Sequence, residues 1–191
     1  VRIEKGAHEL FRLLGDNYAA IKKYDLAIDN YRKGLSVLRM TSFDALPDSS
    51  LLFGYHYAMA DIHARKHDAM SAVTTFKMAN EYARTQQEKA DVASYLNWIN
   101  WDNGNIRSAE AWDGILEMEK ATDYVRMAAA CRKLVSNLSN PNAKMTVMHK
   151  LAVVEFEVLN KKIDAVMRMH NVYQLLSPQQ LKYPNEEIQQ Y

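Results

Sequence analysis

The sequence predicts an all-helical fold in which consecutive helices pack as antiparallel pairs, and three observations lead to this prediction. Glycine and proline are scarce, at 6 and 4 of 191 residues, as expected for a mostly helical chain. Apolar residues make up 48% of the chain and recur at helical spacing, without the alternation that marks a strand. A pattern of small and large residues at 14–34 recurs further along the chain.

The first helix pair is predicted from residues 14–34. Small residues in this segment would let two helices come close together, and large residues would fill the spaces beside them. We expect helices at 2–21 and 26–40, joined by a turn at 22–25. The positions that define the pattern are Leu14, Gly15, Tyr18, Tyr24, Ala27, Tyr31 and Gly34.

A second helix pair is predicted 45 residues after the first. Pro47 cannot lie inside a helix, so a loop precedes this pair and accounts for the long spacing. Asp48 is suited to cap the helix that is expected to begin near Leu51. The matching positions of the second pair are Met59, Ala60, His63, Ala72, Phe76 and Ala79.

A third helix pair is predicted at 87–120 from its turn. Gly104 tolerates the left-handed backbone that such turns need, and Asn105 is a common turn residue. Asp113 stands where the pattern has an aromatic residue, with Trp112 beside it. The third copy of the pattern is therefore the most degraded of the three.

A fourth pair and a last helix complete the predicted array. The fourth pair is expected at 122–138 and 142–160, with Phe156 among the residues that face a neighbouring helix. A helix at 162–176 would close the array, as terminal helices of repeat proteins do. The polar segment 178–191 is expected to be a loose tail.

This arrangement resembles the tetratricopeptide repeat, a helix-turn-helix unit of about 34 residues. The resemblance rests on the small and large positions given above, and it covers 8–120 closely and 121–176 more loosely. It implies a single domain, residues 1–177, folded as a right-handed superhelical solenoid of about four antiparallel helix pairs and a C-terminal capping helix. The implied units are 1–40, 49–86, 87–120 and 121–160, followed by the capping helix 162–176.

The same resemblance implies a concave face, lined by the first helix of each pair, where a partner would bind. Tyr, Trp and Arg are enriched where binding energy concentrates, so the aromatic residues would anchor a ligand and Arg12 and Arg65 would set its polarity. For Trp98 and Trp101 a second interpretation stays open, which is packing between neighbouring helices. The predicted partner-binding residues are Arg12, Asp16, Tyr57, Asp61, Arg65, Tyr95, Trp98, Trp101 and Asp102.

One class of partner is argued against by the residues at these positions. Repeat proteins of this kind that hold the acidic C-terminal tails of heat-shock chaperones use Lys, Asn and Arg as a carboxylate clamp. This chain offers only Arg12 at the matching positions, and Asp16 and Asp91 would repel an acidic ligand. The other matching positions are Ala58 and Tyr95.

Charge and composition argue against other kinds of partner. The formal net charge of +1 gives no basic excess for direct binding of nucleic acid or an anionic membrane. No run of 18 apolar residues is present, so no membrane span is expected. Cys131 is the only cysteine, which excludes an internal disulfide, and its small-residue surroundings predict burial.

No catalytic constellation or cofactor motif is present in the sequence. Neither a glycine-rich phosphate loop nor G-x-S-x-G occurs. His63 and His67 have the spacing of two imidazoles on one helix face, but His67 falls at a predicted turn, so no metal site is expected. Glu155 is expected on a helix surface, paired with a cation one turn away.

The expected function is therefore a non-catalytic scaffold that binds a protein or peptide in the groove of its array. The alternative is a sensory or regulatory domain of a larger signalling or transcription regulator, which would bind a peptide or small effector. We expect no cofactor and a cytoplasmic location, and homo-oligomerisation is left open.

Overall fold

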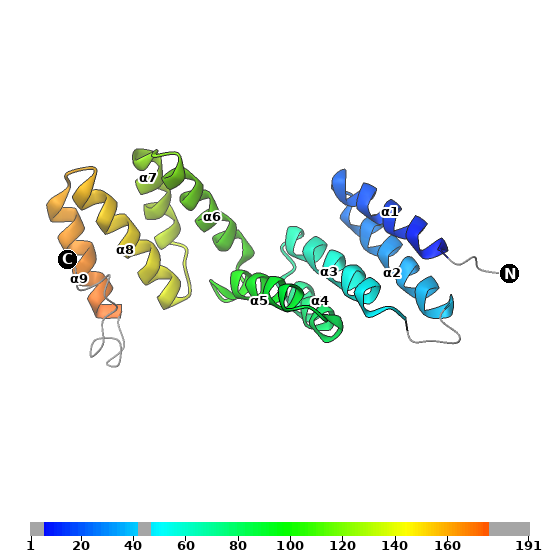
Figure 1. The fold of residues 1–191 in the computed structure, drawn as a ribbon. Helices are drawn as coiled ribbons and strands as arrows, with labels where there is room; N and C mark the ends of the chain where they lie inside the picture. The colour runs from blue at the N-terminus through cyan, green and yellow to red at the C-terminus, as the bar shows by residue number, and fades with distance from the viewer. Residues whose placement is uncertain (1–5, 42–46, 176–191) are drawn as a thin grey trace. The chain divides into compact units, whose positions relative to one another are not determined.

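The computed structural model describes residues 6–41 and 47–175, and in these ranges the chain forms nine α-helices and no strand, which confirms the predicted all-helical fold. Figure 1 shows the order of the helices along the chain. The predicted start at Arg2, the end of the last helix at Leu176 and the tail 178–191 lie outside the described residues. The helices are α1 (Ala7–Ala20), α2 (Tyr24–Thr41), α3 (Ser49–Arg65), α4 (Ala69–Tyr82), α5 (Gln86–Asn100), α6 (Ile106–Lys120), α7 (Tyr124–Val135), α8 (Pro141–Glu157) and α9 (Lys162–Leu175).

Side-chain caps fix several of the helix starts. The Asp48 carboxylate accepts a hydrogen bond from the N–H of Ser50 at 2.9 Å and begins α3 as the sequence predicts. The Asn140 side chain accepts from the N–H of Asn142 at 2.9 Å, and Pro141 then occupies the first turn of α8. Proline is favourable there because the first helical N–H groups have no partner inside the helix.

The same tight turn follows α1, α3 and α6. Lys22, His67 and Thr122 have φ values of 59°, 58° and 56°. These values lie in the left-handed region, which residues other than glycine seldom adopt. In each turn the N–H of the next residue donates to the carbonyl oxygen five residues earlier, at 2.8 to 2.9 Å. This recurrence is compatible with a helical repeat.

The chain divides into two compact units. The first contains residues 1–100 and 104–106, and the second contains 101–103 and 107–191. The division falls inside the predicted third pair, so α5 belongs to the first unit and α6 after Ile106 to the second.

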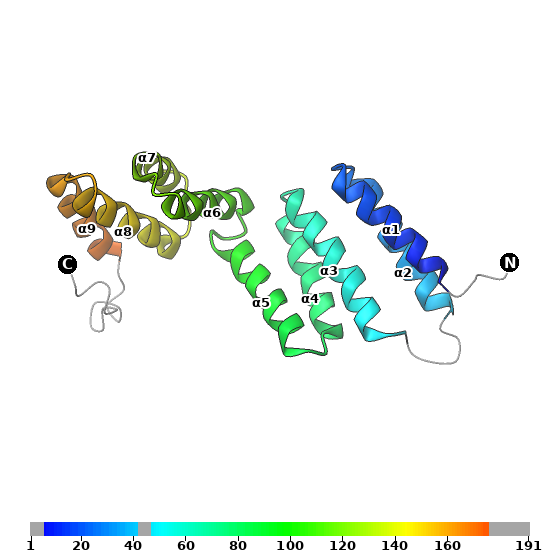
Figure 2. The same cartoon turned by 45° about the horizontal axis from the view of Figure 1, so that its top comes forward.

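In the first unit each helix packs against its neighbours in the chain. Contacts join α1 to α2, α2 to α3, α3 to α4 and α4 to α5, and Figures 1 and 2 both show α1 beside α2 and α3 beside α4. The predicted small-residue contact forms between α1 and α2, because Gly15 lies directly under the ring of Tyr31. The backbone of Gly34 faces the ring of Tyr55 in the same way, between α2 and α3.

In the second unit α8 is the central helix, and it packs against both α7 and α9. The core of the second unit contains Met127 and Cys131 of α7 and Val147 and Leu151 of α8. Burial raises the pKa of the Cys131 thiol to about 11, which makes this cysteine unreactive at neutral pH. The predicted closing helix α9 forms a packed pair with α8.

The prediction for Glu155 is wrong. Its side chain is fully buried, whereas the neighbouring Phe156, predicted to face a helix, is exposed. The carboxylate bonds to two guanidiniums from other helices, Arg132 of α7 at 2.6 Å and Arg168 of α9 at 2.5 Å. These two cations offset the cost of burying the charge of Glu155 between α7 and α9.

Candidate functional site

Seven of the nine predicted partner-binding residues lie in the first unit, on the odd-numbered helices. On α3 they are spaced four residues apart, so their side chains leave the same side of the helix. We call this set the first-helix face. It consists of Arg12 and Asp16 on α1, Tyr57, Asp61 and Arg65 on α3, and Tyr95 and Trp98 on α5.

An aromatic cluster joins α3 to α5 at the first-helix face. The rings of Tyr57 and Tyr95 meet edge to face with centroids 5.7 Å apart, and Tyr95 stacks on the buried Phe76 at 4.9 Å. Trp98 meets the edge of Tyr95 at 6.4 Å. The two tyrosines and Trp98 are half-buried, so the cluster packs on the core and also presents aromatic surface.

Burial and nearby acidic groups raise the pKa values of the two phenols in this cluster. Burial is the largest cause that raises the pKa of Tyr57 to about 12, and the nearby Tyr95, Asp91 and Asp61 raise it further. Burial also raises the pKa of Tyr95, followed by the charge of Asp61. The phenols are therefore neutral at physiological pH and act as hydrogen-bond donors and acceptors.

Two polar contacts hold three of the four charged members of the face. The Arg65 Nε donates to Asp61 Oδ2 at 2.8 Å within α3. The Tyr31 hydroxyl donates to Asp16 Oδ1 at 2.6 Å and ties α2 to α1. Burial and this carboxylate both raise the pKa of Tyr31. Sequence reasoning placed Tyr31 in the helix contact but missed its second role, which is to orient Asp16.

The other two predicted residues, Trp101 and Asp102, belong to the second unit. Trp101 stacks on Trp112 with ring centroids 5.6 Å apart and packs against the core of that unit. This contact matches the packing interpretation that the sequence left open for Trp101.

Asp102 is fully buried and joins two turns of the second unit. Its Oδ1 atom accepts hydrogen bonds from the backbone N–H groups of Ser139 and Asn140 at 2.9 and 2.8 Å. It also accepts one from the Ser139 hydroxyl at 3.0 Å. Burial works to raise the pKa of this carboxyl, but the bonds from Asn140 and Ser139 and from Ser108 hold it below its usual range. The Asp102 carboxylate is therefore engaged inside the second unit.

Replacing Asp102 by alanine is expected to lower the free energy of unfolding by about 1–2 kcal/mol, because two backbone N–H groups lose their acceptor. Urea unfolding of the wild type and of D102A would measure the difference. Asp113→Ala is the matched control, since this neighbouring aspartate is exposed on α6. Equal stabilities for D102A and the wild type would show that the carboxylate does not hold the two turns together.

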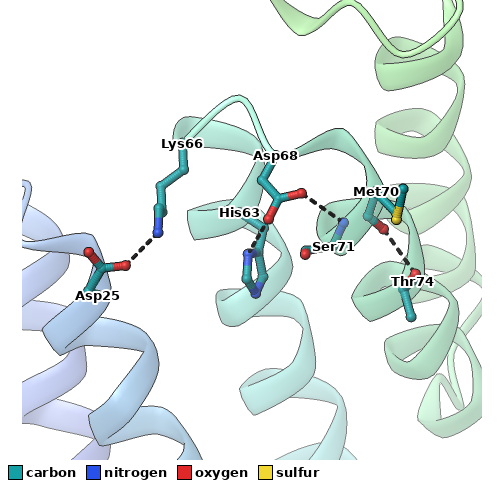
Figure 3. A network of polar contacts seen from close by, with 7 residues as sticks. All are labelled: Asp25, His63, Lys66, Asp68, Met70, Ser71 and Thr74. Carbon is teal, nitrogen blue, oxygen red and sulfur yellow. Dashed lines mark hydrogen bonds and ion pairs between the residues drawn. The ribbon is translucent and has the colours of Figure 1, made fainter.

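His63, the first of the two histidines singled out in the sequence, is part of a polar network at the turn between α3 and α4. Figure 3 shows His63 Nδ1 facing Asp68 Oδ2, at 3.6 Å, while the other carboxylate oxygen of Asp68 caps α4 through the N–H of Ser71 at 3.1 Å. In the same view Lys66 reaches Asp25 at the start of α2. Across residues 6–41 and 47–175 no three metal-ligating side chains gather.

One surface hollow of the first unit lies on α2, away from the predicted residues. It has a volume of about 450 Å³ and is wide open to solvent. Its walls include two guanidiniums, and it lacks the enclosure of a small-molecule site. The lining residues are Arg32, Leu35, Ser36, Arg39 and Met40.

Comparisons with protein-family models, with curated proteins and with solved structures give no match to this chain. The class defined by the fold is therefore an all-helical array in which neighbouring helices pack against one another. Among the described helices none has the length and apolar character needed to cross a membrane.

Proposed function

We propose that the chain is a non-catalytic scaffold of the tetratricopeptide type, which binds an extended or helical segment of a protein partner at the first-helix face. In this proposal Tyr57, Tyr95 and Trp98 anchor the segment, and the charged groups of α1 and α3 fix its direction. The proposal includes a cytoplasmic location. Its mechanism is preorganised display, in which packed helices hold the binding groups in place before the partner arrives.

The observation that carries this proposal is the half-buried aromatic cluster bordered by charged groups. Its aromatic rings are held by contacts with one another and with Phe76, so little side-chain freedom would be lost on binding. Half-buried Tyr and Trp beside Arg are the residue types in which interface energy concentrates. The recurring turns after α1 and α3 support the repeat-type assignment.

Peptides selected from a random displayed library on the wild-type protein provide the test. Removing the ion pair of the face, with Asp61→Ala and Arg65→Ala together, is expected to weaken binding of the selected peptides at least tenfold, or about 1.4 kcal/mol. The pair lies within one helix, with Arg65 exposed and Asp61 partly buried, so its loss is expected to change the stability of the fold by less than about 1 kcal/mol. Fluorescence anisotropy would measure the dissociation constants.

The matched control is the ion pair of Asp29 and Lys33 on α2. It has the same four-residue spacing, a distance of 2.7 Å and half-exposed side chains, but it lies outside the first-helix face. The double variant Asp29→Ala and Lys33→Ala is expected to bind the peptides as the wild type does. Equal binding by both double variants would contradict the proposed face, as would a library that yields no binder.

A further inference from the structure

His56 of α3 is a buried imidazole that the proposed binding face does not use. The residue is 6% exposed, and neither ring nitrogen has a hydrogen-bond partner in the part of the chain that the structure describes. Buried polar side chains are nearly always hydrogen-bonded, because an unpaired polar atom inside a protein costs free energy. The imidazole of His56 is therefore an exception, and the cost of burying it depends on whether it carries a proton.

Helices α2 and α4, which both pack against α3, supply the groups around His56. The ring of Tyr82 at the end of α4 stacks on the imidazole, with centroids 5.5 Å apart and 9° between the planes. The charged groups that act on His56 among the described residues are the Arg39 guanidinium of α2 and the Glu81 carboxylate of α4. Burial is the largest cause that lowers the pKa of His56, and Arg39 lowers it further against the opposing effect of Glu81. The neutral ring is thus the form that fits this position.

A proton on His56 would change its hydrogen-bonding needs. The neutral imidazole has one donor and one acceptor, whereas the protonated ring has two donors and a positive charge. Neither nitrogen faces an acceptor here, so the protonated ring would be a buried cation without a hydrogen bond. It can regain water only if the ring leaves its stack on Tyr82 or if α3 separates locally from α2 and α4.

We propose that His56 is a pH-sensitive switch of the first unit, and that proton uptake in mildly acidic solution loosens the packing of α3 against α2 and α4. Tyr57 and Asp61 of the first-helix face lie on the same helix, and the Tyr57 ring meets Tyr95 of α5 at 5.7 Å. A shift of α3 would separate these rings, so a segment bound at the face is released in acid. This release rests on the proposed function, whereas the loosening of α3 does not.

His63, two turns further along α3, is placed differently. Its Nδ1 atom faces Asp68 Oδ2 at 3.6 Å. Burial, Arg32 and Lys66 lower the pKa of His63, but the Asp68 carboxylate opposes them. A protonated His63 thus keeps an anion directly beside it, whereas a protonated His56 has no acceptor within hydrogen-bond distance. The switch is therefore assigned to His56.

The pH dependence of unfolding tests the switch. Because the unfolded chain takes up the proton below a pH of about 6.5 and the folded chain does so only at lower pH, stability is lost as the pH falls through this window. Between pH 7.5 and 5.5 the unfolding equilibrium constant of the first unit is expected to rise at least about threefold more with His56 than with His56→Phe. Urea unfolding of the full chain, followed by Trp98 in a Trp101→Phe and Trp112→Phe background, would measure both rises.

Phenylalanine keeps a ring for the stack on Tyr82 but takes up no proton, so equal rises would overturn the proposal. The control is His67→Asn, which removes an exposed imidazole and suits the left-handed backbone of that turn. This variant is expected to keep the pH response of the parent protein, and loss of that response would overturn the assignment to His56. If His56→Phe does not fold, an NMR titration of the His56 ring in the wild type decides, since a midpoint at or above about 6.5 would contradict the switch.

Binding of the selected peptides tests the release. From pH 7.5 to 5.5 their dissociation constants are expected to increase at least about threefold more for the wild type than for His56→Phe, in step with the loosening of α3. Equal changes for the two proteins would overturn the release. A library that yields no binder would contradict the proposed function instead, and the urea measurement would still decide whether His56 is a switch.

Discussion

Replacing Glu155 by alanine is expected to lower the free energy of unfolding of the second unit by about 3 kcal/mol. The carboxylate is fully buried between Arg132 of α7 and Arg168 of α9, at 2.6 and 2.5 Å. Its removal leaves two guanidiniums facing each other without their shared anion, and breaking a buried ion pair from one side costs about 3–5 kcal/mol. We expect the lower end of that range because both arginines are partly exposed and can regain water.

Tryptophan fluorescence in a Trp98→Phe background would follow this unfolding, since the two remaining tryptophans, Trp101 and Trp112, both lie in the second unit. The control is Glu119→Ala, which removes a partly exposed ion pair with Lys150 of α8. That loss is expected to cost less than about 1 kcal/mol. A Glu155→Ala loss no larger than the Glu119→Ala loss would contradict the central role of Glu155.

The same ion triad predicts how the stability of the second unit depends on pH. Burial works to raise the pKa of Glu155, but the hydrogen bonds and charges of Arg168 and Arg132 lower it overall. A carboxyl with a lowered pKa in the folded state stabilises the fold above the pKa of the unfolded state, about 4.3, and loses this effect as the pH falls. The stability difference between wild type and Glu155→Ala should therefore shrink in acid.

Glu155 also shows why part of the fold could not be predicted from the sequence. A glutamate beside a phenylalanine on a helix is expected to face water, because an isolated charge is costly to bury. Here the cations that permit burial come from positions 23 residues before and 13 residues after the glutamate. Neither separation appears in the helical periodicity of α8. Local patterns predict where helices form. Which residues of α8 face inward depends on contacts among α7, α8 and α9, and local patterns do not show these contacts.

The helices and turns of the first half were predictable because their signals are local. Pro47 and Asp48 predicted the start of α3, and the tight turn after α1 was expected within 22–25. For the candidate site, the pattern placed Tyr57 and Tyr95 on helices that prove to be in contact. It could not assign Trp98 and Trp101 to different units, because they are only three positions apart and the helical periodicity shows no boundary between them.

Replacing Gly15 by alanine is expected to destabilise the first unit by up to about 2 kcal/mol, although alanine is the better helix former by about 1 kcal/mol. A Cβ atom at this position would lie 2.5 Å from Cε1 and 2.6 Å from Cδ1 of the Tyr31 ring. The ring has little room to move, because Tyr31 is buried and its hydroxyl bonds to Asp16 at 2.6 Å. Forcing an extra carbon into such packing costs about 1–3 kcal/mol and occasionally more.

Gly54 provides the matched control in the same unit. A Cβ atom there would meet only the end of the Arg12 side chain, at 4.0 Å. Gly54→Ala is therefore expected to stabilise the unit by up to about 1 kcal/mol through helix propensity alone. Urea unfolding would be followed by the fluorescence of Trp98 in a Trp101→Phe and Trp112→Phe background.

A double-mutant cycle with Tyr31→Leu separates the effect of the ring from other effects of the added carbon. If the close approach of α1 and α2 depends on the fit between Gly15 and Tyr31, Gly15→Ala should lose most of its cost once the ring is gone. An unchanged cost in the Tyr31→Leu background would place the strain elsewhere. The small and large positions that predict the helix pair would then owe their pattern to something other than this contact.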